Sequence, residues 1–181
     1  MSPSFSDRLA VLPQYLIPKQ ALTAFAGWVA GSQWGGATTR IIDWFVKRYN
    51  VNMAEAVNPD TASYKSFNEF FTRPLQASAR PLAAAAFVSP VDGAISQCGP
   101  IAGDQVFQAK GHSYSTQALV GGDAALAAQF QDGEFATLYL SPRDYHRIHM
   151  PCAGRLTRMI YVPGELFSVN PTTARGVPGL F

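Results

Sequence analysis

The side chains most suited to chemistry lie between Ser141 and Met150, a segment that carries two of the three histidines, His146 and His149. Charged side chains flank both of them: Arg143, Asp144 and Arg147. Histidine is the side chain whose ordinary pKa lies closest to neutrality, so two histidines beside guanidinium groups indicate proton transfer near an anionic substrate. The alternative is that one is a hydrogen-bonded core histidine and the other lies on the surface.

Asp92 is the carboxylate that could assist one of these histidines. It lies in a Ser-Pro-Val-Asp-Gly stretch ending at Gly93, where the ordinary role of an aspartate is to bond the backbone of a turn. In the functional alternative, a carboxylate bonded to one imidazole nitrogen fixes the tautomer and stabilises the imidazolium. That interpretation pairs Asp92 with His149.

A metal site is a further alternative, because nitrogen and oxygen ligands are available from His112, Asp144, His146 and His149. A His-x-x-His spacing is weak evidence, since helical zinc sites favour two histidines at i and i+4 with a glutamate between them. The chain also lacks the glycine-rich loops that cradle phosphates. We predict no metal, although a metal-dependent hydrolase using His112, His146 and His149 stays open.

Composition excludes several other classes. A formal net charge of +2 on 181 residues is too small to indicate nucleic-acid binding. Two cysteines, Cys98 and Cys152, stand far apart, so neither a disulfide framework nor a structural zinc site is indicated. Pro13 and Pro18 interrupt the early apolar runs, so we expect no secretory signal.

Two helices are expected near the N-terminus, because apolar residues recur there at i, i+3, i+4 and i+7. The first set is Leu22, Phe25, Ala26 and Val29, and the second is Ile42, Phe45, Val46 and Tyr49. Gly35 and Gly36 separate the sets, which predicts a helical hairpin. The stretch is too polar and too rich in glycine to span a membrane.

Aromatic residues in this hairpin suggest contact with lipid. All three tryptophans fall here among lysines and arginines, a pairing that suits the boundary between water and lipid. The residues expected to touch the membrane are Phe25, Trp28, Trp34 and Trp44. The alternative is that they pack on the rest of the protein, because amphipathic helices are usually core helices.

The remaining pattern predicts an α+β fold. Ser66 and Glu69 form a capping box before a short apolar helix that ends at Arg73–Pro74. Strands are expected at 86–88, 94–96, 105–107, 135–140 and 156–162, and one helix from Asp123 to Phe130. We therefore predict a membrane-associating helical region over residues 1–57 and a mostly antiparallel β catalytic domain with one or two short helices over 58–181.

Together these segments resemble bacterial phosphatidylserine decarboxylase along essentially the whole chain. The segments are 59–64 (PDTASY), 67–75 (FNEFFTRPL), 90–93 (PVDG), 108–112 (QAKGH), 139–152 (YLSPRDYHRIHMPC) and 161–170 (YVPGELFSVN). The resemblance implies a pyruvoyl enzyme that converts phosphatidylserine to phosphatidylethanolamine and carbon dioxide, bound peripherally at the cytoplasmic face of the inner membrane. It implies that Asp92 and His149 belong to an Asp-His-Ser triad for self-cleavage, and that His146 serves decarboxylation.

The chain departs from this family in one respect. The family's nucleophile is the serine of a Leu-Gly-Ser-Thr segment, which becomes the pyruvoyl group, whereas the one Gly-Ser pair here is Gly31–Ser32 inside the helical region. We therefore expect the front part of a longer protein, inert by itself, whose partner is the α chain made by self-cleavage. A homodimer is also compatible with the resemblance, and a noncatalytic membrane-binding module is the second alternative.

Phosphatidylserine would need a cationic anchor for its phosphate group. Arg143 and Arg147 are the candidates from the residues alone. The full set expected to bind substrate is His112, Arg143, Arg147, Phe167, Ser168 and Asn170.

Overall fold

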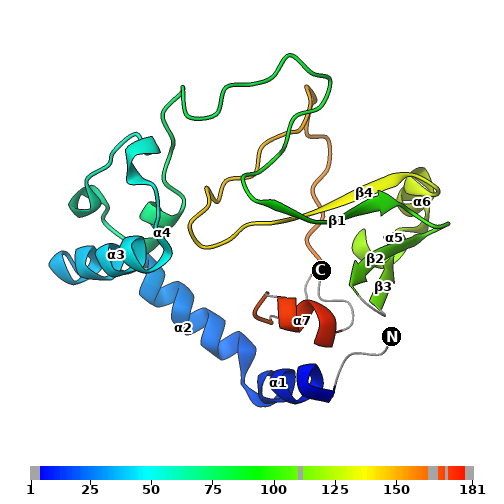
Figure 1. Ribbon diagram of the computed structural model, residues 1–181, viewed down its shortest axis with the longest axis horizontal. Helices are drawn as coiled ribbons and strands as arrows, with labels where there is room; N and C mark the ends of the chain where they lie inside the picture. The colour runs from blue at the N-terminus through cyan, green and yellow to red at the C-terminus, as the bar shows by residue number, and fades with distance from the viewer. Residues whose placement is uncertain (1–4, 110–111, 163–166, 170, 178–181) are drawn as a thin grey trace. The chain divides into compact units, whose positions relative to one another are not determined.

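The structure is a computed structural model that describes residues 5–109, 112–162, 167–169 and 171–177 (Figure 1). It divides into two compact units, each made of segments distant in sequence. The first unit takes the described residues of Met1–Thr23, Ile95–Thr137 and Arg158–Phe181, and the second takes Ala24–Ala94 and Leu138–Thr157. The predicted division at residues 57 and 58 concerns function and stays a prediction.

Two small sheets lie among the described residues. In the first unit β2 (Gln105–Ala109) pairs antiparallel with β3 (His112–Ser115), with a register irregularity between Phe107 and Ala109. In the other sheet β1 (Ala94–Pro100) pairs with β4 (Glu134–Tyr139). Successive side chains of a strand point to opposite faces, so Val106 and Gln108 of β2 are buried while Phe107 between them is exposed; Ile101 is buried as well.

Short capped helices complete the first unit. Ser115 accepts a hydrogen bond from the Ala118 N–H and starts α5 (Thr116–Leu119). Asp123 does the same for Leu126 at the start of α6 (Ala124–Ala127), which continues as η3 (Ala128–Phe130). Serine and aspartate caps satisfy N–H groups that a helix start leaves unpaired. Near the chain ends, α1 (Phe5–Leu16) packs against α7 (Pro171–Gly176).

The second unit is built on an aromatic core. In α3 (Gly36–Tyr49), Ile42 is fully buried and packs in one cluster with Val51, Tyr64 and Phe70. The Phe70 ring lies 5.9 Å from that of Phe45 and 5.8 Å from that of Tyr64, between ring centroids. Edge contacts of this kind add to the burial of large rings.

A capping box starts the short helix that carries Phe70. The Ser66 hydroxyl accepts from the Glu69 N–H at the start of α4 (Phe67–Phe71), and the Glu69 carboxylate accepts from the Lys65 N–H. Two 3₁₀ turns, η1 (Met53–Glu55) and η2 (Thr61–Ser63), connect α3 to this helix. The expected helix and its cap are therefore confirmed.

Irregular chain forms the rest of the second unit and frames its cavities. The Val88 N–H donates to the Pro151 carbonyl at 2.8 Å, and the His149 N–H donates to the Pro90 carbonyl at 2.8 Å. Gly93 has a φ of +131°, and a Cβ there would lie 2.4 Å from the Tyr139 carbonyl oxygen. Only glycine fits this close approach, which holds the backbone beside Asp92 in place.

Several predicted elements are confirmed. The helix expected around residues 22–29 is α2 (Lys19–Gly31), and that around 42–49 is α3. The strands at 94–96, 105–107 and 135–140 and the helix from Asp123 also form. The hairpin predicted for these two helices is not confirmed. From Ala24 on, α2 leads into α3 at an open angle in Figure 1 and does not fold back along it.

Other predictions were wrong. Residues 86–88 and 156–162 are not strands, because neither segment pairs with a strand in the described chain. Leu156 and Tyr161 in the second segment are largely exposed. The second half is therefore mixed helix and sheet rather than mostly β. Sequence reasoning also missed α1, which contains Pro13, together with α5 and α7. Tertiary packing of α1 on α7 outweighs the helix propensity that the proline removes.

We predict that Phe70→Ala lowers the free energy of unfolding of the second unit by roughly 3 to 5 kcal/mol, because it leaves a cavity in the aromatic core. Urea unfolding followed by tryptophan fluorescence measures this, since all three tryptophans lie in that unit. Leu156→Ala is the control, because Leu156 is 76% exposed. Equal losses in the two variants would contradict the assigned core.

Candidate functional site

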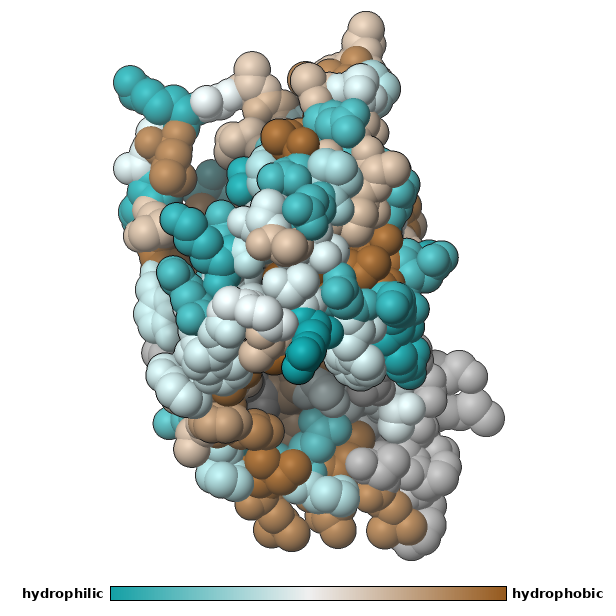
Figure 2. Space-filling view, turned by 90° about the vertical axis from the view of Figure 1, so that its left-hand side faces the viewer, coloured by the Kyte–Doolittle hydropathy of each residue, from teal (hydrophilic) through white to brown (hydrophobic). Residues whose placement is uncertain are grey.

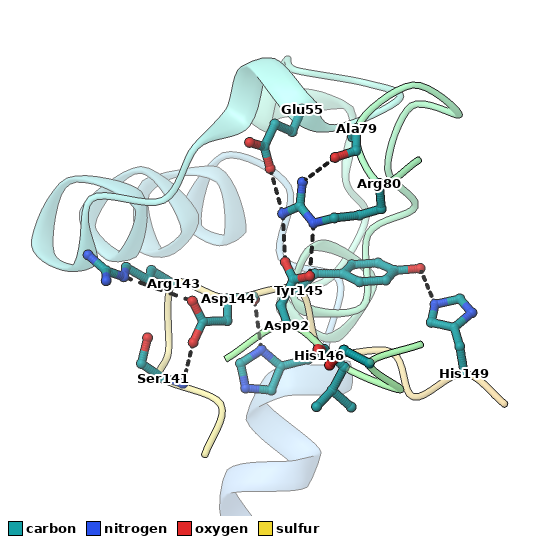
Figure 3. A network of polar contacts seen from close by, with 12 residues as sticks. Glu55, Ala79, Arg80, Asp92, Ser141, Arg143, Asp144, Tyr145, His146 and His149 are labelled. Atoms are coloured by element: carbon teal, nitrogen blue, oxygen red, sulfur yellow. Dashed lines mark hydrogen bonds and ion pairs between the residues drawn. The ribbon is translucent and has the colours of Figure 1, made fainter. Parts of the chain in front are cut away.

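The histidine segment is tied to its surroundings through its backbone and one arginine. The Arg147 Nε donates to the Thr72 carbonyl at 2.7 Å, just after α4. The His149 N–H bonds to Pro90, two residues before Asp92. The Asp144 carboxylate accepts from the Ser141 N–H at 2.6 Å and closes a turn before the histidines. These contacts bring the predicted site segments together in one unit (Figure 3).

Asp92 is held by a planar guanidinium. Arg80 Nε lies 2.8 Å from Asp92 Oδ1, and Arg80 Nη2 lies 2.6 Å from Oδ2. The same Nη2 donates to Glu55 at 2.8 Å, and Nη1 donates to the Ala79 carbonyl at 2.7 Å (Figure 3). This fork geometry is the strong form of an arginine–carboxylate pair.

The charge on Asp92 is stabilised by these contacts. Hydrogen bonds from Arg80 hold the pKa of Asp92 below its ordinary value, although partial burial opposes them, and the Tyr145 backbone N–H adds to the lowering. The pKa of Arg80 is raised in turn by its bonds to Asp92 and Glu55. Asp92 is therefore an ionised acceptor at neutral pH.

His149 contacts the side chain of Tyr145 rather than that of Asp92. Its Nε2 lies 3.2 Å from the Tyr145 hydroxyl, and the two rings stack with centroids 5.6 Å apart and planes at 22°. No hydrogen bond joins Asp92 to His149 in the part of the chain that the structure describes, so the direct pair suggested by the sequence is replaced by the Arg80 pair. Both side chains nevertheless line one cavity of about 830 Å³, together with Tyr145.

His146 has different partners. Its Nδ1 lies 2.9 Å from the Asp144 carbonyl oxygen, and its ring lies against Phe71 with centroids 4.1 Å apart. The two imidazoles lie well apart in Figure 3. Among the residues with described positions, no three histidine, cysteine, aspartate or glutamate side chains gather in an arrangement that could hold a metal ion.

A smaller cavity of about 260 Å³ shares Asp92 and Tyr145 with the larger one. Arg143 lines it, and its Nε is 3.9 Å from Asp144 Oδ1, a weak contact that leaves the guanidinium exposed. Arg147, by contrast, is engaged with the Thr72 carbonyl. Arg143 is thus the candidate phosphate anchor that faces a cavity.

Three residues of this site were missed by the sequence analysis: Arg73, Arg80 and Tyr145. Arg73 lines the smaller cavity at 3% exposure, its Nε has no hydrogen-bond partner among the described atoms, and burial lowers its pKa. Nothing in the spacing links Arg80 to Asp92 twelve residues later. Tyr145 was visible as an aromatic residue beside His146, which was the available signal.

Other predicted substrate residues belong to the first unit. The Phe167 ring lies 5.1 Å from that of Tyr15 in α1, and Lys19 Nζ lies 4.1 Å from the Phe167 centroid. The Ser168 hydroxyl lies 3.1 Å from the side-chain oxygen of Gln14. The side chain of His112, and all of Asn170, lie outside the described residues.

The predicted membrane residues are at the surface. Trp28 contacts both Phe25 and Trp34, with ring centroids 5.9 and 5.8 Å apart, whereas Trp44 contacts Tyr49. α2 buries no residue, and Trp28 is 61% exposed. Separately, Figure 2 shows hydrophobic residues at the lower end of the face that it presents, and it does not identify them as these four. None of the helices in the described ranges is long and apolar enough to cross a membrane.

Comparison with known proteins defines the class. The family model described as phosphatidylserine decarboxylase matches residues 67–181, and a second model, described as PSD, matches residues 9–50. The predicted resemblance is confirmed, and the chain belongs to the phosphatidylserine decarboxylase family.

Individual relatives agree with this membership. The chain is 78% identical to the phosphatidylserine decarboxylase proenzyme of Dechloromonas aromatica and 76% identical to that of Albidiferax ferrireducens, over 97% of its own length in both cases. It is 74% identical to the proenzyme of an Azoarcus species, again over 97% of its length. The chain spans 62%, 62% and 61% of the lengths of these three curated relatives.

We predict that Arg80→Gln raises the pKa of Asp92, because the first cause of its lowering is removed. Titration of the Asp92 carboxyl by carbon NMR measures this directly. A lowered native pKa contributes stability above the ordinary carboxyl pKa of about 4 that is lost as pH falls. The variant should therefore lose about 1 kcal/mol or less at pH 7, since Arg80 is half exposed, and the loss should shrink in acid.

The matched control for that titration is Arg155→Gln, which removes an exposed cation from the same unit. Asp92 should titrate there as in the unaltered chain. An Asp92 pKa that is unchanged in Arg80→Gln would contradict the ion pair.

Proposed function

We propose that the complete protein is a pyruvoyl-dependent phosphatidylserine decarboxylase that converts phosphatidylserine to phosphatidylethanolamine and carbon dioxide. The observation that carries this proposal is the family match across residues 67–181, the region that contains Asp92, His146 and His149. The relatives are named proenzymes, which supports self-cleavage as the step that activates this protein too.

The proposed cleavage needs a base, a charge partner and a serine. His149 takes the proton of the serine hydroxyl, whose oxygen bonds to the preceding glycine carbonyl carbon while the C–N bond breaks, giving an ester. Elimination of that ester, followed by hydrolysis with loss of ammonia, leaves the ketone. Asp92, kept ionised by Arg80, stabilises the imidazolium.

The serine itself is not among the residues of this chain. Ser32 of the single Gly-Ser pair donates from its hydroxyl to the Trp28 carbonyl at 2.7 Å, which is a helix-end contact. The larger cavity, beside His149 and Asp92, offers room for a further segment. Ser141 Oγ, like Arg73 Nε, is also buried without a hydrogen-bond partner among the described atoms, although neither residue lines the larger cavity.

The pyruvoyl group fits the larger cavity chemically. Phe87, Val88 and Met150 line it together with Asp92, Tyr145 and His149, so an apolar wall faces a few polar groups. When bound, the group supplies the electron sink for the pair released as carbon dioxide leaves. The apolar wall keeps water from the scissile carboxylate. Arg143, which lines the smaller cavity that shares Asp92 and Tyr145 with this one, is the proposed phosphate anchor. His146, which lines neither of these two cavities, is the proposed donor of a proton to the product, a role that rests on the family resemblance.

The same proposal extends to the membrane. Phosphatidylserine resides in a bilayer, so we infer that Phe25, Trp28, Trp34 and Trp44 contact lipid and hold the protein peripherally at the cytoplasmic face. Their exposure on α2, on α3 and in the link between them, near Lys19, Arg40 and Lys47, supports this inference. Pairing with the α chain and assembly as a homodimer remain predictions.

The activity is tested on a joined proenzyme, in which this chain is followed by the C-terminal part of the Dechloromonas aromatica relative. We predict that it cleaves itself on purification and releases carbon dioxide from phosphatidylserine. His149→Ala should slow cleavage at least about a hundredfold, because a general base is lost. Band shifts on a denaturing gel measure this.

His146→Ala provides the contrast within the same experiment. It should leave cleavage largely intact and lower the turnover of phosphatidylserine, measured by release of labelled carbon dioxide. A joined proenzyme that folds without cleaving would refute the proposed function. Normal processing of His149→Ala would refute its role as the base.

Lipid contact is tested by changing Phe25 and Trp28 to Ser in the joined proenzyme. We predict that sedimentation with vesicles of phosphatidylethanolamine and phosphatidylglycerol falls about tenfold or more, because each buried aromatic side chain contributes roughly 1.5 to 3 kcal/mol. Leu156→Ser with Met159→Ser is the control, since both side chains are exposed outside these helices. Equal binding by the two double variants would count against the helical surface.

A further inference from the structure

Tyr145 makes two independent contacts with His149. Its hydroxyl lies 3.2 Å from His149 Nε2, and its ring stacks on the imidazole with centroids 5.6 Å apart. Figure 3 shows the phenol reaching across to His149 from the segment that carries both residues. A stacked ring and a hydrogen bond together restrict both the tilt and the rotation of the imidazole.

Tyr145 is also next to Asp92. It lines both cavities, as do Asp92, Arg80 and Leu75. Its backbone N–H interacts with the Asp92 carboxylate. The bond from the His149 N–H to Pro90 fixes the backbone of the histidine near the same loop. Tyr145 therefore lies between the two residues proposed to act together.

The hydrogen bond has a direct consequence for the imidazole. A neutral histidine carries its proton on one ring nitrogen and accepts at the other, and the partner of one nitrogen determines which. The contact between the Tyr145 hydroxyl and Nε2 allows either atom to donate, and the tautomer decides which; donation by the phenol is the direction that we infer. A phenol that donates to Nε2 places the histidine proton on Nδ1.

The charged groups around this contact do not compete for Nε2. Among the residues that line the larger cavity, Arg80 and Asp92 are the charged side chains, and they are bonded to each other. A histidine with its proton on Nδ1 is the form that donates to a carboxylate and accepts a proton at Nε2. That is the form required of a base in self-cleavage.

We propose that Tyr145 is a positioning residue that holds His149 in the tautomer protonated at Nδ1, until the hydroxyl of the incoming serine takes the place of the phenol at Nε2. This inference rests on the proposed function. The stacked ring then keeps the imidazole oriented while Nε2 receives the serine proton. Tyr145 acts through His149 rather than on the serine or on the glycine carbonyl.

Tyr145→Phe in the joined proenzyme tests this, because it keeps the stacked ring and removes one hydroxyl. We expect cleavage to slow about five- to tenfold, the size of one lost hydrogen bond. We also expect the nitrogen NMR signals of His149 to move toward the tautomer protonated at Nε2, recorded in a form whose nucleophilic serine is changed to alanine. A purely structural role would change the melting temperature without moving those signals.

Tyr161→Phe is the matched control, since Tyr161 is 86% exposed and lies outside the second unit. It should cleave at the rate of the unaltered protein and leave the nitrogen NMR signals of His149 unchanged. If Tyr145→Phe cleaves at the normal rate with unchanged His149 signals while the unaltered joined proenzyme is active, the inference about Tyr145 is overturned and the proposed function stands. If the unaltered joined proenzyme does not cleave, the proposed function fails, and the nitrogen signals still decide whether Tyr145 sets the tautomer.

Discussion

The ion pair between Arg80 and Asp92 is the interaction on which the site depends. Arg80 joins three segments that no regular element connects, because its guanidinium contacts Glu55 after α3, its own neighbour Ala79, and Asp92. Two carboxylates drawn toward one another repel unless a cation lies between them. The planar fork of arginine supplies that cation with directional bonds, which a lysine would not reproduce.

This pair does not prevent Asp92 from acting on an imidazole. An ionised carboxylate has two oxygens with about four lone-pair sites; Arg80 uses one on each oxygen, and the Tyr145 backbone N–H uses another. Acceptor capacity is therefore left for a histidine N–H, and the lowered pKa keeps that acceptor charged. The orienting acid of a triad must remain ionised while the imidazolium forms. Arg80 supports that role because it keeps the Asp92 carboxylate ionised.

Local patterns in the sequence predicted local structure well and long-range contacts poorly. The Ser66 cap, the Asp123 cap and the period of α3 depend on neighbours within four residues, so they could be read directly. The strand expected at 156–162 failed because a strand needs a partner, and no pattern within a segment reveals one. The ion pair of Arg80 with Asp92 could not be predicted either, because its two residues are separated by 12 positions of irregular chain. The phenol of Tyr145 lay inside the segment already singled out, but its bond to His149 depends on a backbone path that spacing does not determine.

The separation of the two histidines follows from that backbone path. On a helix, residues three positions apart share a face, so His146 and His149 would have pointed the same way. Here the segment is irregular, and its anchors at Thr72 and Pro90 direct one imidazole onto Phe71 and the other toward Tyr145. Two imidazoles with separate partners can serve separate steps, which a shared metal ion would not allow. Cleavage and decarboxylation occur at different times in the proposed reaction, so a base for the first step and a separate proton donor for the second suit it better than a coupled pair.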